Sequence, residues 1–197
     1  MHTRLILIGL FVVLTACTGH RSLPEDNYYA LPKLIDVTEG KQLFNMISVM
    51  DFQADDIYKE RAIVYTEDDI TFKLYHYHHW IDSPSRLLTE RLAERLRLDH
   101  FARYVLTTYE GDSELIIKGR IKSFERIRLD NKDSVRVRLV LQVNSSSKYL
   151  PVLLDEYSET VTADGNTITD TVTAFARAVD LIFSRFQKEL RENLSEN

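Results

Sequence analysis

A long alternation of apolar and charged residues between positions 115 and 143 constrains the fold of this chain more than any other feature. Apolar side chains recur at every second position on both sides of a polar turn, Asp130-Asn131-Lys132-Asp133. Because successive side chains of a strand point to opposite faces, a period of two indicates long strands that each bury one face. The segment therefore predicts a long antiparallel hairpin with its apolar side chains in the core.

The other face of this hairpin is expected to be basic. Its positively charged side chains are Lys118, Arg120, Lys122, Arg126, Arg128, Arg136 and Arg138. In this register Arg126 and Arg136 are expected to stand nearly opposite each other, which is unfavourable unless acidic groups or solvent screen them. Two interpretations stay open. The face is either a solvated surface whose charges keep sheet edges apart, or an electrostatic contact for an acidic partner or anionic lipid headgroups.

Two main helices are expected to cover the sheet. The first starts after Ser83, which can cap a helix and is followed by Pro84, a residue suited to the first helical position. The second runs from about Thr167 to Leu194, with apolar side chains at steps of three and four. Further strands are expected at residues 28–32, 44–52, 62–65, 70–80, 104–109 and 150–161. The pattern indicates a single α/β or α+β domain with a mixed, largely antiparallel sheet of about seven strands.

The first sixteen residues have the pattern of a secretory signal peptide. Arg4 supplies positive charge, residues 5–14 form an unbroken apolar run, and Thr15-Ala16 places small residues before the cut. Ten residues rise about 15 Å as a helix, which is half of the roughly 30 Å hydrocarbon core of a bilayer. We therefore expect this leader to target the chain and then to be removed.

The end of the leader, Leu14-Thr15-Ala16-Cys17, resembles the lipobox of bacterial lipoproteins. The resemblance implies that the Cys17 thiol receives a diacylglycerol and that the new amino terminus is acylated, for example with palmitate. Cys17 is the only cysteine in the chain. Thr18 follows it, whereas lipoproteins kept in the inner membrane commonly carry Asp there, so the resemblance favours a periplasm-facing anchor in the outer membrane.

Length and composition limit what the mature chain can be. Residues 17–27 are expected to form the lipidated cysteine and a polar tether, and residues 28–197 one folded domain. A formal net charge of −5 argues against a nucleic-acid-binding protein, which normally has a basic domain. With one cysteine, no disulfide can form within a chain.

The sequence offers little chemistry for catalysis. His76 and His78 share one face of an expected strand and could chelate a metal ion, but no third ligand is evident. Acidic groups such as 67–69 lack the ligand spacing and glycine of a calcium loop. No nucleophile elbow or phosphate loop is present. We expect a protein that is not an enzyme and that has no metal and no cofactor other than the lipid on Cys17.

Several segments together resemble one known family. They are Tyr28-Tyr29 shortly after the lipobox, Tyr58 with Arg61 and Ile63-Val64-Tyr65, Tyr75-His76-Tyr77-His78-His79-Trp80, and Pro84 with Leu87-Leu88-Thr89-Glu90-Arg91-Leu92. This combination is similar to that of the ABC-type transport auxiliary lipoproteins. The resemblance is strongest from Tyr58 to Leu96 and follows the element order of nearly the whole mature domain.

The resemblance implies a binding and assembly module of an intermembrane transport system for lipids or other hydrophobic molecules. The implied partners are an MCE-domain protein and an inner-membrane ABC transporter or permease, and homo-oligomer formation stays open. No catalytic residues are carried over from the family. The alternative is a structural lipoprotein of another envelope system, such as lipopolysaccharide or outer-membrane protein insertion. A lipid-anchored hydrolase is the least favoured hypothesis, because no nucleophile and base stand in a recognisable setting.

Overall fold

The structure of the protein is a computed structural model that describes residues 24–34, 40–108, 111–129 and 132–195. The expected leader, Cys17 and most of the tether lie outside the described residues. Within them, nine strands form one sheet. The strands are β1 (Asn27–Tyr29), β2 (Phe44–Val49), β3 (Gln53–Ala54), β4 (Ala62–Thr66), β5 (Phe72–Trp80), β6 (Ala102–Leu106), β7 (Leu115–Leu129), β8 (Lys132–Ser145) and β9 (Leu153–Thr162). The helices are η1 (Asp56–Tyr58), α2 (Pro84–Leu98) and α3 (Ile168–Ser195).

The sheet is organised around β7, the longest strand. On one side β7 pairs with β8 in an antiparallel ladder, and β8 pairs in the same way with β9. On its other side lie three short parallel strands in chain order, with Ile47 of β2 beside Leu115, Gln53 of β3 beside Arg120 and Val64 of β4 beside Glu125. The predicted long hairpin is therefore confirmed, and the chain from β2 to β4 runs along its edge.

The predicted fold class is confirmed: the protein is an α+β domain with a mixed sheet. The long ladders and the β4–β5 hairpin are antiparallel, whereas β1, β2, β3 and β6 make short parallel pairings. The single strand expected at 44–52 is divided into β2 and β3. The strand expected at 104–109 begins earlier, at Ala102, because β6 takes its register from Phe44 of β2.

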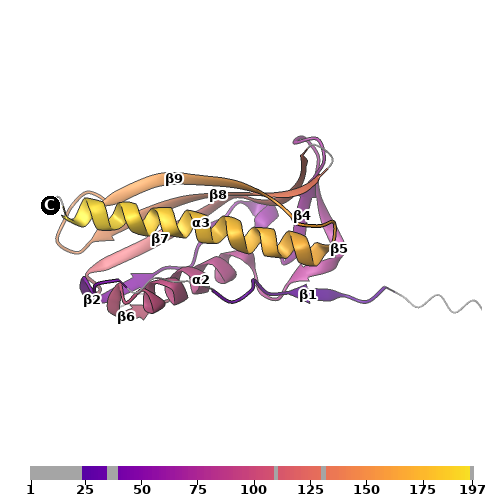
Figure 1. The fold of residues 1–197 in the computed structure, drawn as a ribbon. Helices are drawn as coiled ribbons and strands as arrows, with labels where there is room; N and C mark the ends of the chain where they lie inside the picture. The colour runs from indigo at the N-terminus through magenta and orange to yellow at the C-terminus, as the bar shows by residue number, and fades with distance from the viewer. Residues whose placement is uncertain (1–23, 35–39, 109–110, 130–131, 196–197) are drawn as a thin grey trace, which may run out of the picture.

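Both helices cover one face of the curled sheet and lie side by side (Figure 1). Helix α2 starts as expected, since the Ser83 hydroxyl accepts a hydrogen bond from the Arg86 amide. Helix α3 starts with a reciprocal pair in which the Thr167 hydroxyl accepts from the Asp170 amide and the Asp170 carboxylate accepts from the Thr167 amide.

The core lies between this helical layer and the inner face of the sheet. Its largest fully buried side chains include Trp80, Phe101, Phe124, Phe175 and Phe183. The rings of Phe124 and Phe175 lie 4.5 Å apart, and Trp80 stands edge-on to Phe175. Each such side chain stabilises the fold by about 1.5–3 kcal/mol relative to an exposed position. The long hairpin therefore buries its inner face against the helices, and its outer face carries polar and charged groups.

Candidate functional site

A bulge in β7 decides where the predicted basic residues point. Ile121 pairs with Leu139, but the next ladder pair joins Ser123 to Arg138, so Lys122 has no direct partner on β8. Beyond the bulge every side chain of β7 has changed face. Glu125 consequently lies opposite Arg136, and the expectation that Arg126 and Arg136 stand nearly opposite each other is wrong.

Arg126 does not belong to the outer face. Its ladder partner is Val135, a core residue, and its side chain is only 10% exposed. The Nη2 atom lies 2.5 Å from Oδ1 of Asp133, whose side chain is 4% exposed, and Arg128 donates to the same oxygen at 3.2 Å. These two arginines therefore fix the end of the hairpin, and their charges are compensated within the chain.

The basic side chains on the outer face are largely compensated as well. Lys122 donates to Asp55 at 2.8 Å, and this hydrogen bond is the main reason why the pKa of Asp55 is lowered. Arg120 donates to Gln53 at 2.9 Å and lies 3.6 Å from Asp55. Lys118 is exposed, and it forms no ion pair within the part of the chain that the structure describes. Arg138 lies 3.7 Å from Glu156 of β9.

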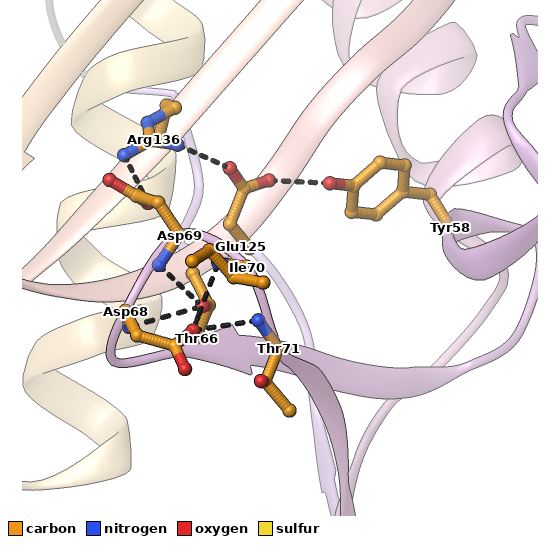
Figure 2. A network of polar contacts seen from close by, with 8 residues as sticks. All are labelled: Tyr58, Thr66, Asp68, Asp69, Ile70, Thr71, Glu125 and Arg136. Atoms are coloured by element: carbon orange, nitrogen blue, oxygen red, sulfur yellow. Dashed lines mark hydrogen bonds and ion pairs between the residues drawn. The ribbon is translucent and has the colours of Figure 1, made fainter.

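A buried carboxylate, Glu125, lies on the outer face of β7, and Figure 2 shows its polar contacts. Its Oε2 atom accepts a hydrogen bond from the Tyr58 hydroxyl at 2.8 Å. Its Oε1 atom has no hydrogen-bond partner and lies 3.5 Å from Nη1 of Arg136. Burial raises the pKa of Glu125, and burial together with the adjacent Glu125 charge raises the pKa of Tyr58. Sequence reasoning missed Glu125 because it is surrounded by basic residues in the chain.

Arg136 extends this network to the turn between β4 and β5. Its Nη2 atom donates to Asp69 at 2.8 Å, and Asp69 adopts a positive φ of 59°. The neighbouring Asp68 carboxylate accepts from the amides of Thr71 and Ile70 at 2.7 and 2.9 Å, which lowers the pKa of Asp68 to about 2. Figure 2 shows how Arg136 bridges the turn and Glu125. The tip of the β4–β5 hairpin is thereby attached to β8.

Two open cavities meet at Arg120 and Gln53. One, of about 580 Å³, extends toward Lys59 and Ser85, and the other, of about 460 Å³, extends toward Lys118 and Gln142. Both have mixed polar and apolar linings with acidic and basic groups, among them Asp51, Asp55 and Asp56. Such a surface suits contacts with a polar partner, whereas a site for a hydrophobic molecule has a predominantly apolar lining. We name this region the Arg120 groove.

The imidazole rings of His78 and His79 in β5 have protein partners. Nδ1 of His78 lies 2.9 Å from the Tyr29 hydroxyl, and Nε2 of His79 lies 3.1 Å from the carbonyl oxygen of His76. Among the described residues, no three His, Cys, Asp or Glu side chains are grouped closely enough to hold a metal ion. The same part of the chain contains no helix with the length and apolarity needed to cross a membrane.

Comparison with known families gives one match. The model of a family described as ABC-type transport auxiliary lipoprotein component matches residues 29–185. This range contains every segment on which the resemblance was based except Tyr28, and it ends within α3. A comparison with curated proteins finds no match.

Comparison with solved structures shows the same fold in proteins of low sequence identity. Protein XCC0632 from Xanthomonas campestris superposes with a TM-score of 0.75 at 14% identity, covering 87% of this chain and 99% of that one. An uncharacterized protein gives 0.67 at 13% identity, with 84% and 99% coverage. The hypothetical protein CT253 from Chlamydia trachomatis gives 0.53 at 6% identity, with 79% and 100% coverage. At these identities the likeness concerns the fold alone.

Proposed function

The chain belongs to the ABC-type transport auxiliary lipoprotein family, and on this premise we propose that it is an outer-membrane-anchored accessory module of an MCE-type intermembrane transport system. The observation that carries the proposal is the family match over residues 29–185, which spans the sheet and most of both helices. The family is one of transport components and not of enzymes. Two parts of the proposal, lipid attachment at Cys17 and location in the outer membrane, are supported by the sequence pattern around Cys17.

The outer face of the sheet supports a role in assembly. The buried carboxylate of Glu125 is paired with Arg136. The Arg120 groove presents both acidic and basic groups to a partner, and it lacks the predominantly apolar lining that a hydrophobic cargo would need. Lys59, which also lines the groove, is paired with Asp56 at 2.6 Å. The exposed basic side chains that β7 contributes to the groove are Lys118 and Arg120. We propose that Lys118 and Arg120 contact acidic groups of the transport partner. An electrostatic contact with an acidic partner was one of the two interpretations of the basic face of the hairpin.

Crosslinking of the native membrane-bound protein, followed by mass spectrometry of what is attached, tests this function. Recovery of an MCE-domain protein or an ABC permease supports it. Recovery of an outer-membrane barrel without transporter components contradicts it and favours the alternative, an assembly lipoprotein of another envelope system. The same capture is repeated with Lys118→Glu/Arg120→Glu, which we expect to reduce recovery at least threefold.

A matched control is offered by Lys132, an exposed lysine of β8 at the far end of the hairpin from Lys118. Lys132→Glu makes the same kind of charge change outside the Arg120 groove, so recovery is expected to stay at the wild-type level. Equal recovery with all three proteins would exclude the groove as the contact. Circular dichroism confirms that each variant is folded.

A further inference from the structure

Strand β5 exposes apolar side chains at one end of the molecule. Phe72, Leu74 and Tyr77 are 37%, 41% and 45% exposed, and Ile70 in the preceding turn is 85% exposed. In the described residues β5 pairs with β4 and, over His78–Trp80 alone, with β1. The edge of β5 before His78 therefore has no neighbouring strand there. Scattered apolar side chains are ordinary on protein surfaces, but four along one turn and strand edge indicate an interaction surface.

The chain enters the domain beside this edge. Asn27 of β1 pairs with His78 of β5, so the first strand leads directly to the residue that follows Tyr77. Tyr28 is 54% exposed, with its ring 5.5 Å from that of His79 and the Arg61 guanidinium 5.0 Å above it. Figure 1 shows β1, β4 and β5 at one end of the molecule and the carboxyl terminus at the other.

The length of the preceding segment sets how far this end can lie from a lipid on Cys17. Nine residues lie between Cys17 and Asn27, so ten residue-to-residue steps join the two. Fully extended they span at most about 35 Å, and as a flexible chain they span about 18 Å on average. A surface held this close to a bilayer meets it at a high effective concentration, so even a weak contact becomes occupied.

We propose that the exposed apolar side chains of β1 and of the β4–β5 hairpin, namely Tyr28, Ile70, Phe72, Leu74 and Tyr77, contact the interfacial region of the bilayer that holds the anchor. The proposal rests on the lipid anchor of the proposed function and assigns the membrane-facing surface of the domain. We name these five residues the membrane edge.

The chemistry of the membrane edge fits this occupant. Tyrosine has an apolar ring and a polar hydroxyl, a combination enriched where bilayers meet water. Lys73 lies between Phe72 and Leu74 and is exposed, and its ammonium group lies 5.8 Å from the centre of the Tyr65 ring. The nearby carboxylates of Asp68 and Asp69 are engaged by the amides of residues 70 and 71 and by Arg136, respectively.

Fluorescence quenching in vesicles tests the proposal with the full-length, acylated protein. A single cysteine introduced by Ile70→Cys or Tyr77→Cys is labelled with an environment-sensitive fluorophore, since acylation leaves Cys17 without a free thiol. The vesicles contain phosphatidylethanolamine, phosphatidylglycerol and a lipid with a nitroxide near its headgroup. Tyr149→Cys is the matched control, because Tyr149 is fully exposed in the turn between β8 and β9, at the opposite end of the hairpin.

We expect a blue-shifted emission at positions 70 and 77 and quenching at least threefold stronger than at position 149. Equal quenching at all three positions overturns the proposal. A blue shift at position 70 that grows with protein concentration in detergent, with no further change in vesicles, also overturns it, because a second copy would then cover the edge. The proposal is also overturned if the fluorophore at position 70 is shielded from water only after a transport partner has been added.

Flotation of the vesicles separates a failure of this inference from a failure of the proposed function. A protein that does not float with the vesicles lacks the anchor, and both proposals fall. A protein that floats while its labels at positions 70 and 77 remain as accessible as that at 149 keeps the anchor and disproves the membrane edge alone. Replacing Phe72 and Leu74 by serine in the Tyr77→Cys protein is expected to lower the quenching at least twofold without preventing flotation.

Discussion

Glu125 of β7 lies directly opposite Arg136 of β8, with 3.5 Å between Oε1 of the carboxylate and Nη1 of the guanidinium. The Glu125 side chain is 1% exposed and that of Arg136 is 29% exposed, so the pair lies at the boundary between the sheet and solvent. Arg136 supplies the positive charge nearest to the buried oxygen and simultaneously binds Asp69. The stability of the hairpin and the attachment of the β4–β5 turn therefore depend on the same guanidinium.

Replacement of Arg136 by leucine is expected to destabilise the domain by about 3 kcal/mol, because it leaves Glu125 charged, buried and without a counter-ion. The measurement is the free energy of unfolding in urea at pH 7. The double variant Glu125→Gln/Arg136→Leu is the control, and it should recover at least half of the loss since no buried charge remains. If the double variant is as unstable as the single one, lost packing and not the unpaired charge is the cause.

The pKa of Glu125 predicts a particular pH dependence of stability. Burial raises it above the ordinary value of 4.5, so the folded protein holds this proton to a higher pH than the unfolded chain does. Stability contributed by the protonated carboxyl is complete below pH 4.5 and is lost as the pH rises through the folded value. Glu125→Gln removes this term, and its stability relative to wild type should increase as the pH rises from 4.5 to 8.

Urea unfolding of both proteins at several pH values gives this difference directly. The pKa values of Asp55, Asp68 and Asp170 are lowered in the folded protein. Their contribution to the stability of the protein is therefore lost as the pH falls, which is opposite in sign to that of Glu125. They are present in both proteins and cancel in the difference. A flat difference between pH 4.5 and 8 would mean that Glu125 titrates at its ordinary value in the folded protein.

The register of the outer face shows how far the sequence determines this structure. The alternation of the hairpin predicted the two strands, their pairing and their inner face, since leucine, isoleucine and valine recur there at every second position. One residue of bulge after Ile121 then exchanged the two faces of β7. Phe124, an apolar residue in the expected charged register, was the one local sign of that change, and it is buried beside Trp80.

The partners of the charged groups could not be predicted from local patterns. Tyr58 and Glu125 are 67 positions apart, as are Arg136 and Asp69, and they meet because the chain from β2 to β4 runs along β7. Strand and helix periods report burial and do not report which loop crosses which face. For the same reason the basic set appeared as one surface in the sequence, although two of its arginines share Asp133 at the end of the hairpin.

Gly119 is required by the close approach of Phe52 to β7. A methyl group built at Gly119 would lie 2.5 Å from atoms of the Phe52 ring, which is itself packed against Phe183. Gly119→Ala is therefore expected to cost about 1–3 kcal/mol through overpacking, measured as the free energy of unfolding. The matched control is Gly111→Ala, because a methyl group there meets no atom within 4 Å. A similar loss at both positions would show that backbone flexibility, and not the Phe52 ring, is responsible.

Arg91 forms a bidentate ion pair between the two helices, beside the hydrogen bonds that Arg95 donates to Ser184 and Gln187. Its Nε and Nη2 atoms donate to the two carboxylate oxygens of Asp180 at 2.8 and 2.6 Å, and Nη1 donates to the carbonyl oxygen of Pro32 at 2.5 Å. Lysine cannot reproduce this planar arrangement of donors, so Arg91→Lys should lower the free energy of unfolding by roughly 1.5–3 kcal/mol even though the charge is kept.

Hydrogen exchange distinguishes this loss from a general one. The Arg91 side chain is 5% exposed and ties the segment at Pro32 to both helices, so the amides after β1 and at the middle of α3 should exchange faster in Arg91→Lys. Amides of the β7–β8 ladder, which Arg91 does not touch, should keep their relative protection. Arg86→Lys on the exposed side of α2 is the matched control, because Arg86 is 67% exposed and pairs only with Asp82 in the described residues. Comparable losses in both variants would show that the Asp180 pair contributes no more than a surface ion pair.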